Sequence, residues 1–161
     1  MKKTNKIRGF MAVEVLVAIS IISVSILAMT AVAQKSIYVS SQAFHSTQAD
    51  FLLEEGVEAV RIVRDNAWSN ISSLTSGTTY YPKFSSGTWS LTTTSSDGVV
   101  GIFARSLTIA NVNRDNTTKD IVTSGGTVDN GTKLVTVTVS WKEGGVLVSK
   151  TLQFYILNIF S

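Results

Sequence analysis

The side chains that most often carry enzyme chemistry are scarce in this chain of 161 residues. It contains a single histidine, His45, and no cysteine. Without a second histidine or a thiolate, the chain lacks the usual ligand set for zinc and the usual bases and nucleophiles of covalent catalysis. His45 lies in a stretch with helical periodicity, where a surface position explains it best. We therefore predict that the protein is not an enzyme and needs no cofactor.

Three aspartates form the next candidate site. Asp115, Asp120 and Asp129 lie in the segment 111–133, which is rich in Asn, Gly and Thr. Carboxylates in a loop can bind calcium, but this spacing does not match an EF-hand loop. A polar, turn-rich connection explains the same residues. We predict such a connection and no metal site, with calcium binding as the alternative.

One carboxylate interrupts the most apolar part of the chain. Glu14 is the only charged side chain in residues 10–33, a stretch longer than the roughly 20 residues that cross a bilayer as a helix. A carboxylate at the bilayer centre costs about 2.5–3.5 kcal/mol, and less near an end. Its presence indicates that another charge compensates it.

A basic leader precedes this stretch and ends at Gly9. Its cations are Lys2, Lys3, Lys6 and Arg8. The positive-inside rule places residues 1–9 in the cytoplasm and the C-terminal body outside. These four are part of fourteen basic side chains, so the rest of the chain has ten basic against eleven acidic ones. A nearly neutral body favours no nucleic-acid partner.

Three interpretations of this N-terminus are open. It can be an uncleaved membrane anchor, or a secretory signal peptide cut after Ala33, because Ala31-Val32-Ala33 fits a small-residue cleavage site. Against a signal peptide, the apolar stretch is longer than the usual apolar core of such peptides and contains a carboxylate. The third follows the spacing of Gly9, Phe10 and Glu14. This pattern resembles the class III signal of type IV prepilins and type II secretion pseudopilins.

The resemblance implies processing and assembly. In that family a membrane peptidase cleaves after the glycine and methylates the new terminal residue, which here implies cleavage between Gly9 and Phe10 and N-methylation of Phe10. It also implies that Glu14 meets the Phe10 ammonium of a neighbouring subunit. The expected partners are the prepilin peptidase, other pilin or pseudopilin subunits and the cytoplasmic (inner) membrane. The chain lacks a Cys pair and a Pro in the span, which favours a minor pilin or pseudopilin that primes an extracytoplasmic filament.

The elements that must position these residues follow from periodicity. Residues 34–67 contain no proline and repeat apolar side chains at helical spacing, so we expect one helix from Phe10 to about Ala67. Beyond Trp68 the pattern becomes that of short strands. The alternation in "KLVTVTVSW", followed by "KEGG" and a second run, predicts a hairpin of residues 134–141 and 146–157.

A second alternating run is "IFARSLTIA", with Phe103, Arg105, Leu107 and Ile109 on one face. The predicted fold class is α+β, a pilin-like lollipop in which the outer half of the helix packs on a small antiparallel sheet. The predicted divisions are a cleaved leader 1–9, a membrane and assembly helix 10–33, its amphipathic continuation 34–68 and a β domain 69–161. The competing function is a secreted or membrane-anchored, adhesin-like binding module, and pilus, secretion and DNA-uptake systems are not distinguished.

Overall fold

The structure is a computed structural model that describes residues 5–160, with side chains from Met11 onward. The leader cations Lys2, Lys3, Lys6 and Arg8, and the predicted cleavage residues Gly9 and Phe10, lie outside the residues whose side chains are described. The chain forms two compact units, Met1–His45 and Ser46–Ser161. Each unit is described by itself.

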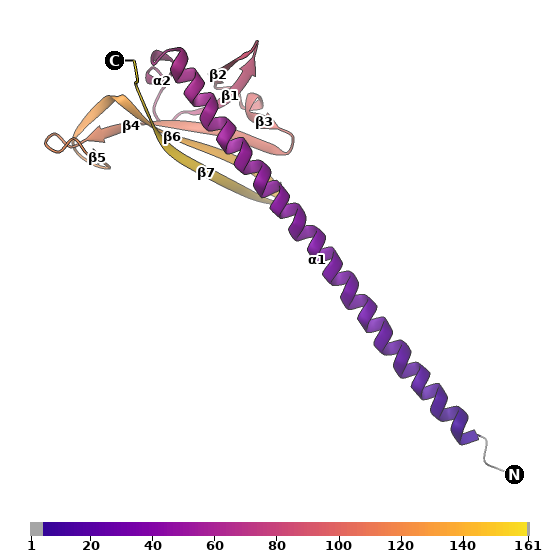
Figure 1. The fold of residues 1–161 in the computed structure, drawn as a ribbon. Helices are drawn as coiled ribbons and strands as arrows, with labels where there is room; N and C mark the ends of the chain where they lie inside the picture. The colour runs from indigo at the N-terminus through magenta and orange to yellow at the C-terminus, as the bar shows by residue number, and fades with distance from the viewer. Residues whose placement is uncertain (1–4, 161) are drawn as a thin grey trace. The chain divides into compact units, whose positions relative to one another are not determined.

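Helix α1 (Asn5–Asn66) runs through 62 residues without a break (Figure 1). The segment contains no proline, and Gly56 is its only glycine beyond Gly9, so nothing interrupts the backbone hydrogen bonds. The helix ends before the short helix α2 (Ser69–Ser72), where the Asn70 amide donates to the Val63 carbonyl at 3.2 Å. The predicted long helix is confirmed, and its end lies one residue before the predicted one.

The second unit contains an antiparallel sheet in the order β2-β1-β4-β6-β7 (Figure 1). Two further short strands, β3 and β5, each pair with β4. The bounds are β1 (Thr79–Ser85), β2 (Thr88–Thr92), β3 (Val99–Val100), β4 (Phe103–Arg114), β5 (Ile121–Val122), β6 (Thr127–Glu143) and β7 (Val146–Leu157), with a 3-10 turn η1 (Ser95–Gly98).

The predicted hairpin is formed by β6 and β7. Their register runs without a shift from Glu143 opposite Val146 to Thr132 opposite Leu157. Gly144 and Gly145 connect the strands with φ values of 57° and 87°. Both central residues of a type I′ turn need positive φ, which glycine adopts at little steric cost. The local sequence therefore sets this turn.

The prediction that residues 111–133 form a polar connection without strands is wrong. Strand β4 extends through Arg114, β6 begins at Thr127, and β5 pairs with β4 between them. The pairing of β4 with β6 shifts register between Asn111 and Val112, so the apolar alternation breaks there and hides the strands from periodicity analysis. Only short turns separate the three strands in this region.

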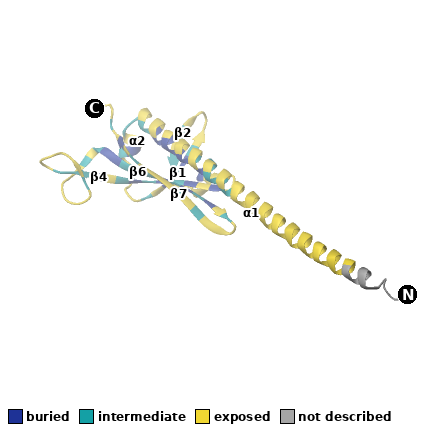
Figure 2. Ribbon diagram, turned by 60° about the horizontal axis from the view of Figure 1, so that its bottom comes forward, coloured by how far each residue is buried: buried dark blue, intermediate teal, exposed yellow. Residues whose placement is uncertain are grey.

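The core of the second unit lies between the outer part of α1 and one face of the sheet (Figure 2). Its members include Ala49, Leu53, Val57, Val60 and Val63 from the helix, with Leu107, Ile109, Val135, Val137, Val139 and Trp141 from the sheet. At Gly56 an added Cβ would lie 2.8 Å from Val137 Cγ1, so the helix approaches the sheet too closely for a side chain. The predicted α+β class, with a helix on an antiparallel sheet, is confirmed.

Candidate functional site in the N-terminal helix

The side chains of the apolar stretch of α1 are exposed all around the helix. Residues 11–41 are all exposed (Figure 2), including Leu16 at 67% and Leu27 at 69%. An 18-residue window in this helix has a mean hydropathy of 2.6, and none of it is buried. The helix is therefore long and apolar enough to cross a membrane.

The hydroxyl groups in this stretch are satisfied within the helix. Ser20, Ser23, Ser25 and Thr30 each donate to a backbone carbonyl three or four residues earlier, at 2.7–2.9 Å. A hydroxyl that bonds to its own helix carries a smaller desolvation cost in an apolar environment. These polar residues are thus compatible with hydrocarbon or with a packed helix bundle.

A polar cluster follows the apolar stretch. Lys35 Nζ lies 5.2 Å from the ring centroid of Tyr38, and Gln42 Nε2 donates to the Tyr38 hydroxyl at 3.1 Å. Long cations and tyrosines with an apolar body and a polar tip are typical of a membrane–water boundary. This cluster was not among the predicted sites, although Lys35, the first cation after the apolar stretch, is followed three residues later by Tyr38, and this spacing could have indicated it.

Glu14 is exposed on the same helix. Among residues 11–160 it has no hydrogen bond or ion pair. Phe10 and Glu14 are one helical turn apart, so they share a face of α1. The Phe10 side chain lies outside the described residues, and the pairing of Glu14 with a Phe10 ammonium stays a prediction.

His45 does not join a cluster of metal ligands. Its ring is tilted against Phe44, with centroids 6.2 Å apart, and the residue is half-buried, which is compatible with the predicted surface position. In the part of the chain that the structure describes, no three acidic or histidine side chains come together to hold a metal.

The three aspartates of the segment 111–133 form no cluster that could hold a metal among the described residues, and two of them organise the backbone. Asp115 Oδ1 accepts hydrogen bonds from the amides of Thr117 and Thr118 at 2.7 and 2.9 Å, which lower the pKa of its carboxyl. Asp129 accepts hydrogen bonds from Arg114, Thr132 and the Gly131 amide. The Arg114 guanidinium is the main reason that the pKa of Asp129 falls to about 2. These carboxylates stabilise turns and strand pairing.

Arg105 is the charged residue most deeply placed in the core, at 3% exposure. It lies on the same face of β4 as Phe103, Leu107 and Ile109, as predicted. Its NH1 is 3.2 Å from Glu55 Oε2, and its guanidinium lies 5.4 Å from the Trp89 ring centroid. A buried cation with these neighbours joins helix to sheet and has no access to a ligand.

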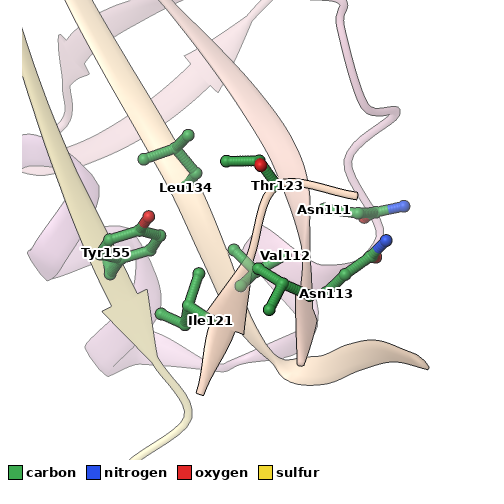
Figure 3. A pocket seen from close by; sticks show the side chains of 8 residues that line it. Asn111, Val112, Asn113, Ile121, Thr123, Leu134 and Tyr155 are labelled. Carbon is green, nitrogen blue, oxygen red and sulfur yellow. The ribbon is translucent and has the colours of Figure 1, made fainter. Parts of the chain in front are cut away.

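A cavity of about 260 Å³ lies where β5 approaches β4, β6 and β7 (Figure 3). Ile121, Leu134 and Tyr155 line it, and the amides of Asn111 and Asn113 point away from Tyr155. It is smaller than typical ligand sites, and no charged residue lines it. It offers no arrangement for catalysis.

Comparisons with protein-family models, with curated proteins and with solved structures gave no match for this chain. The observations define an α+β protein with one N-terminal helix that is long and apolar enough to be a membrane span.

Proposed function

We propose that this protein is a structural subunit, a minor pilin or pseudopilin, of an extracytoplasmic filament assembled from the cytoplasmic (inner) membrane. The observation that carries the proposal is the sequence Gly9-Phe10 with Glu14 one turn later, inside an unbroken helix that contains the largely apolar stretch 10–33. A plain membrane anchor needs neither the glycine nor the carboxylate.

The exposed apolar stretch of α1 suits two environments in succession. In the membrane, lipid covers its side chains; in a filament, the corresponding helices of other subunits replace the lipid. Helix association in hydrocarbon depends on packing and on polar pairs, because lipid and leucine are about equally apolar. The hydroxyl groups of residues 11–33 already donate hydrogen bonds within the helix. Glu14, the one charged side chain of these residues, therefore remains available for a polar contact between helices.

In this proposal Glu14 provides the specific polar contact. The prepilin peptidase cleaves after Gly9 and methylates Phe10, which leaves a cationic amine at the foot of the helix. The Phe10 ammonium of one subunit pairs with Glu14 of the next. Each charge alone is costly in an apolar bundle, whereas the pair compensates both. The pairing thereby sets the axial step between subunits.

Glu14→Leu tests this role in cells that make the complete filament system. We expect the variant to be cleaved at Gly9 and to stay in the membrane, because neither step needs the carboxylate. Copurification with the other subunits should fall at least tenfold, since the Phe10 ammonium loses its partner. Glu14→Asp keeps the charge and is the matched control, which should retain most of the incorporation. Normal copurification of Glu14→Leu would contradict the proposed role.

A further inference from the structure

Strand β7 leaves one edge of the sheet open over its whole length. It is the last strand in the sheet order, it spans 12 residues, and no strand of residues 5–160 pairs with its outer side. The opposite end differs. On that side the outer edge of β4 pairs with three strands along its length, β3, β1 and β5. The strand at that end of the sheet, β2, has only five residues.

The turn between β6 and β7 determines which backbone groups face outward. In a two-residue hairpin the flanking residues, Glu143 and Val146, exchange hydrogen bonds, and every second pair does so thereafter. The Asn158 amide donates to the Gly131 carbonyl at 2.9 Å, in agreement with this alternation. The residues whose amides and carbonyls point away from the sheet are therefore Leu147, Ser149, Thr151, Gln153, Tyr155 and Leu157.

The usual protections of an edge strand are absent from β7. It contains no proline, it has no register shift, and its only charge is Lys150. The Lys150 ammonium is held by both carboxylate oxygens of Asp50 at 2.8 Å and by the Ser46 carbonyl at 3.2 Å, so it is directed to the helix. Leu152 on the strand is 41% exposed. An edge of this kind is a template for an added strand.

The helix beside this edge adds a charge preference. Asp50 is neutralised by Lys150, and Glu58 is paired with Arg61. Glu54 follows Asp50 by one turn and therefore lies on the same flank of α1. It is exposed and has no ion pair or hydrogen bond within the described part of the chain. The flank next to β7 thus presents an uncompensated carboxylate, which favours a basic side chain on the incoming segment.

The size of the edge favours an extended segment over a second folded copy. Twelve residues span about 40 Å, and with a sheet thickness of about 10 Å the edge covers roughly 400 Å². That is about half of what each partner buries in a stable interface between folded proteins.

We propose that the outer edge of β7 binds an extended segment of a partner protein by strand addition. The segment directs apolar and basic side chains to Leu152 and Glu54, and hydroxyl or amide side chains to the other face, beside Thr151 and Gln153. Backbone hydrogen bonds supply affinity, and the alternate side chains supply selectivity. This binding site is separate from the apolar stretch of α1 and from Glu14.

The test uses the full chain in a non-ionic detergent and a fluorescent synthetic peptide of nine residues. The peptide alternates threonine with valine and has one lysine among the valine positions. Anisotropy should show saturable binding to the wild type. Thr151→Pro should weaken binding at least tenfold, because it removes an outward N–H that β6 does not use. Thr151→Val keeps that N–H and is the matched control, and Glu54→Gln should weaken binding about two- to fivefold.

Circular dichroism and the melting temperature show whether each variant is folded, and Ser149→Pro repeats the test at another outward amide if Thr151→Pro unfolds. Equal binding of the peptide to wild type and to a folded proline variant would overturn the proposal. Absence of saturable binding to the wild type would do the same. Dimerisation of the wild type that a proline variant abolishes, without peptide binding, would assign the edge to a second copy and would also overturn it.

Discussion

Helix α1 contains two segments with the same backbone conformation and opposite surroundings. Residues 11–41 expose every side chain, whereas residues 46–66 bury one face against the sheet. Within the first segment, residues 11–33 are apolar around the helix apart from Glu14 and four hydroxyl side chains; the second segment leaves Glu58 and Asp65 exposed opposite its buried face. The amphipathic segment has its apolar partner within the chain, and the uniformly apolar segment needs one from outside.

This difference in burial indicates which interactions stabilise each segment. In residues 46–66, side-chain burial against β4 and β6 holds the helix in place. In residues 11–41 every side chain is exposed, so no such burial contributes. The same substitution should therefore have different consequences in the two segments. The three predictions that follow use unfolding of the full chain in detergent, because Trp68, Trp89 and Trp141 all lie in the second unit and report on it by fluorescence.

Leu53→Ala and Leu27→Ala compare the two segments directly. Leu53 is 6% exposed and Leu27 is 69% exposed. We expect Leu53→Ala to lower the free energy of unfolding of the second unit by about 2–4 kcal/mol, because it leaves a cavity. Leu27→Ala should change it by less than about 0.5 kcal/mol. Similar losses in the two variants, measured by denaturant titration, would contradict the distinction between the segments.

Gly56→Ala tests how closely the outer segment contacts the sheet. The added Cβ would meet Val137 Cγ1 at 2.8 Å and Arg105 Cδ at 3.4 Å. Overpacking of this kind costs about 1–3 kcal/mol, against a gain in helix propensity of about 1 kcal/mol. We expect a net loss of about 1 kcal/mol in the free energy of unfolding. Val137→Ala in the same chain makes room for the methyl group, so the double variant should lose less than the sum of the single losses.

Acid should weaken the second unit through Asp129. Its pKa is about 2 in the folded protein, against an ordinary value of 3.8. A carboxyl with a lowered folded pKa stabilises the fold above its unfolded pKa, and this contribution is lost as the pH falls from about 4 to 2. With the side chain 22% exposed, the contribution is on the order of 1–2 kcal/mol. Asp129→Asn should flatten the pH dependence of unfolding in that range, and parallel profiles would exclude this role.

Much of the fold could be predicted because local patterns determine it. Periodicity and the absence of proline predict the long helix, and alternation around Gly144-Gly145 predicts the β6–β7 hairpin. The burial of Arg105 also follows from alternation, because its neighbours on that face are apolar. Each of these features depends on residues close together in the sequence.

The remainder depends on contacts between distant residues. The extension of β4 and β6 into the segment 111–133 is hidden by the shift after Asn111, and the Arg114–Asp129 ion pair joins residues that no local pattern relates. The identity of the free edge needs the order of the strands, which the sequence does not specify. For the candidate site, Glu14 and the Lys35–Tyr38 contact can be found from residue types, but the compensating charge of Glu14 depends on processing and on a neighbouring subunit.

The central claim is that the apolar segment of α1 belongs to a processed filament subunit, and the mature N-terminus tests it most directly. Mass spectrometry of the protein isolated from its native membrane should give a chain that begins at Phe10 with one methyl group on its amine. A chain that begins at Gln34 would make residues 10–33 a discarded signal peptide. An intact Met1 would make them a plain anchor, and either result would contradict the account.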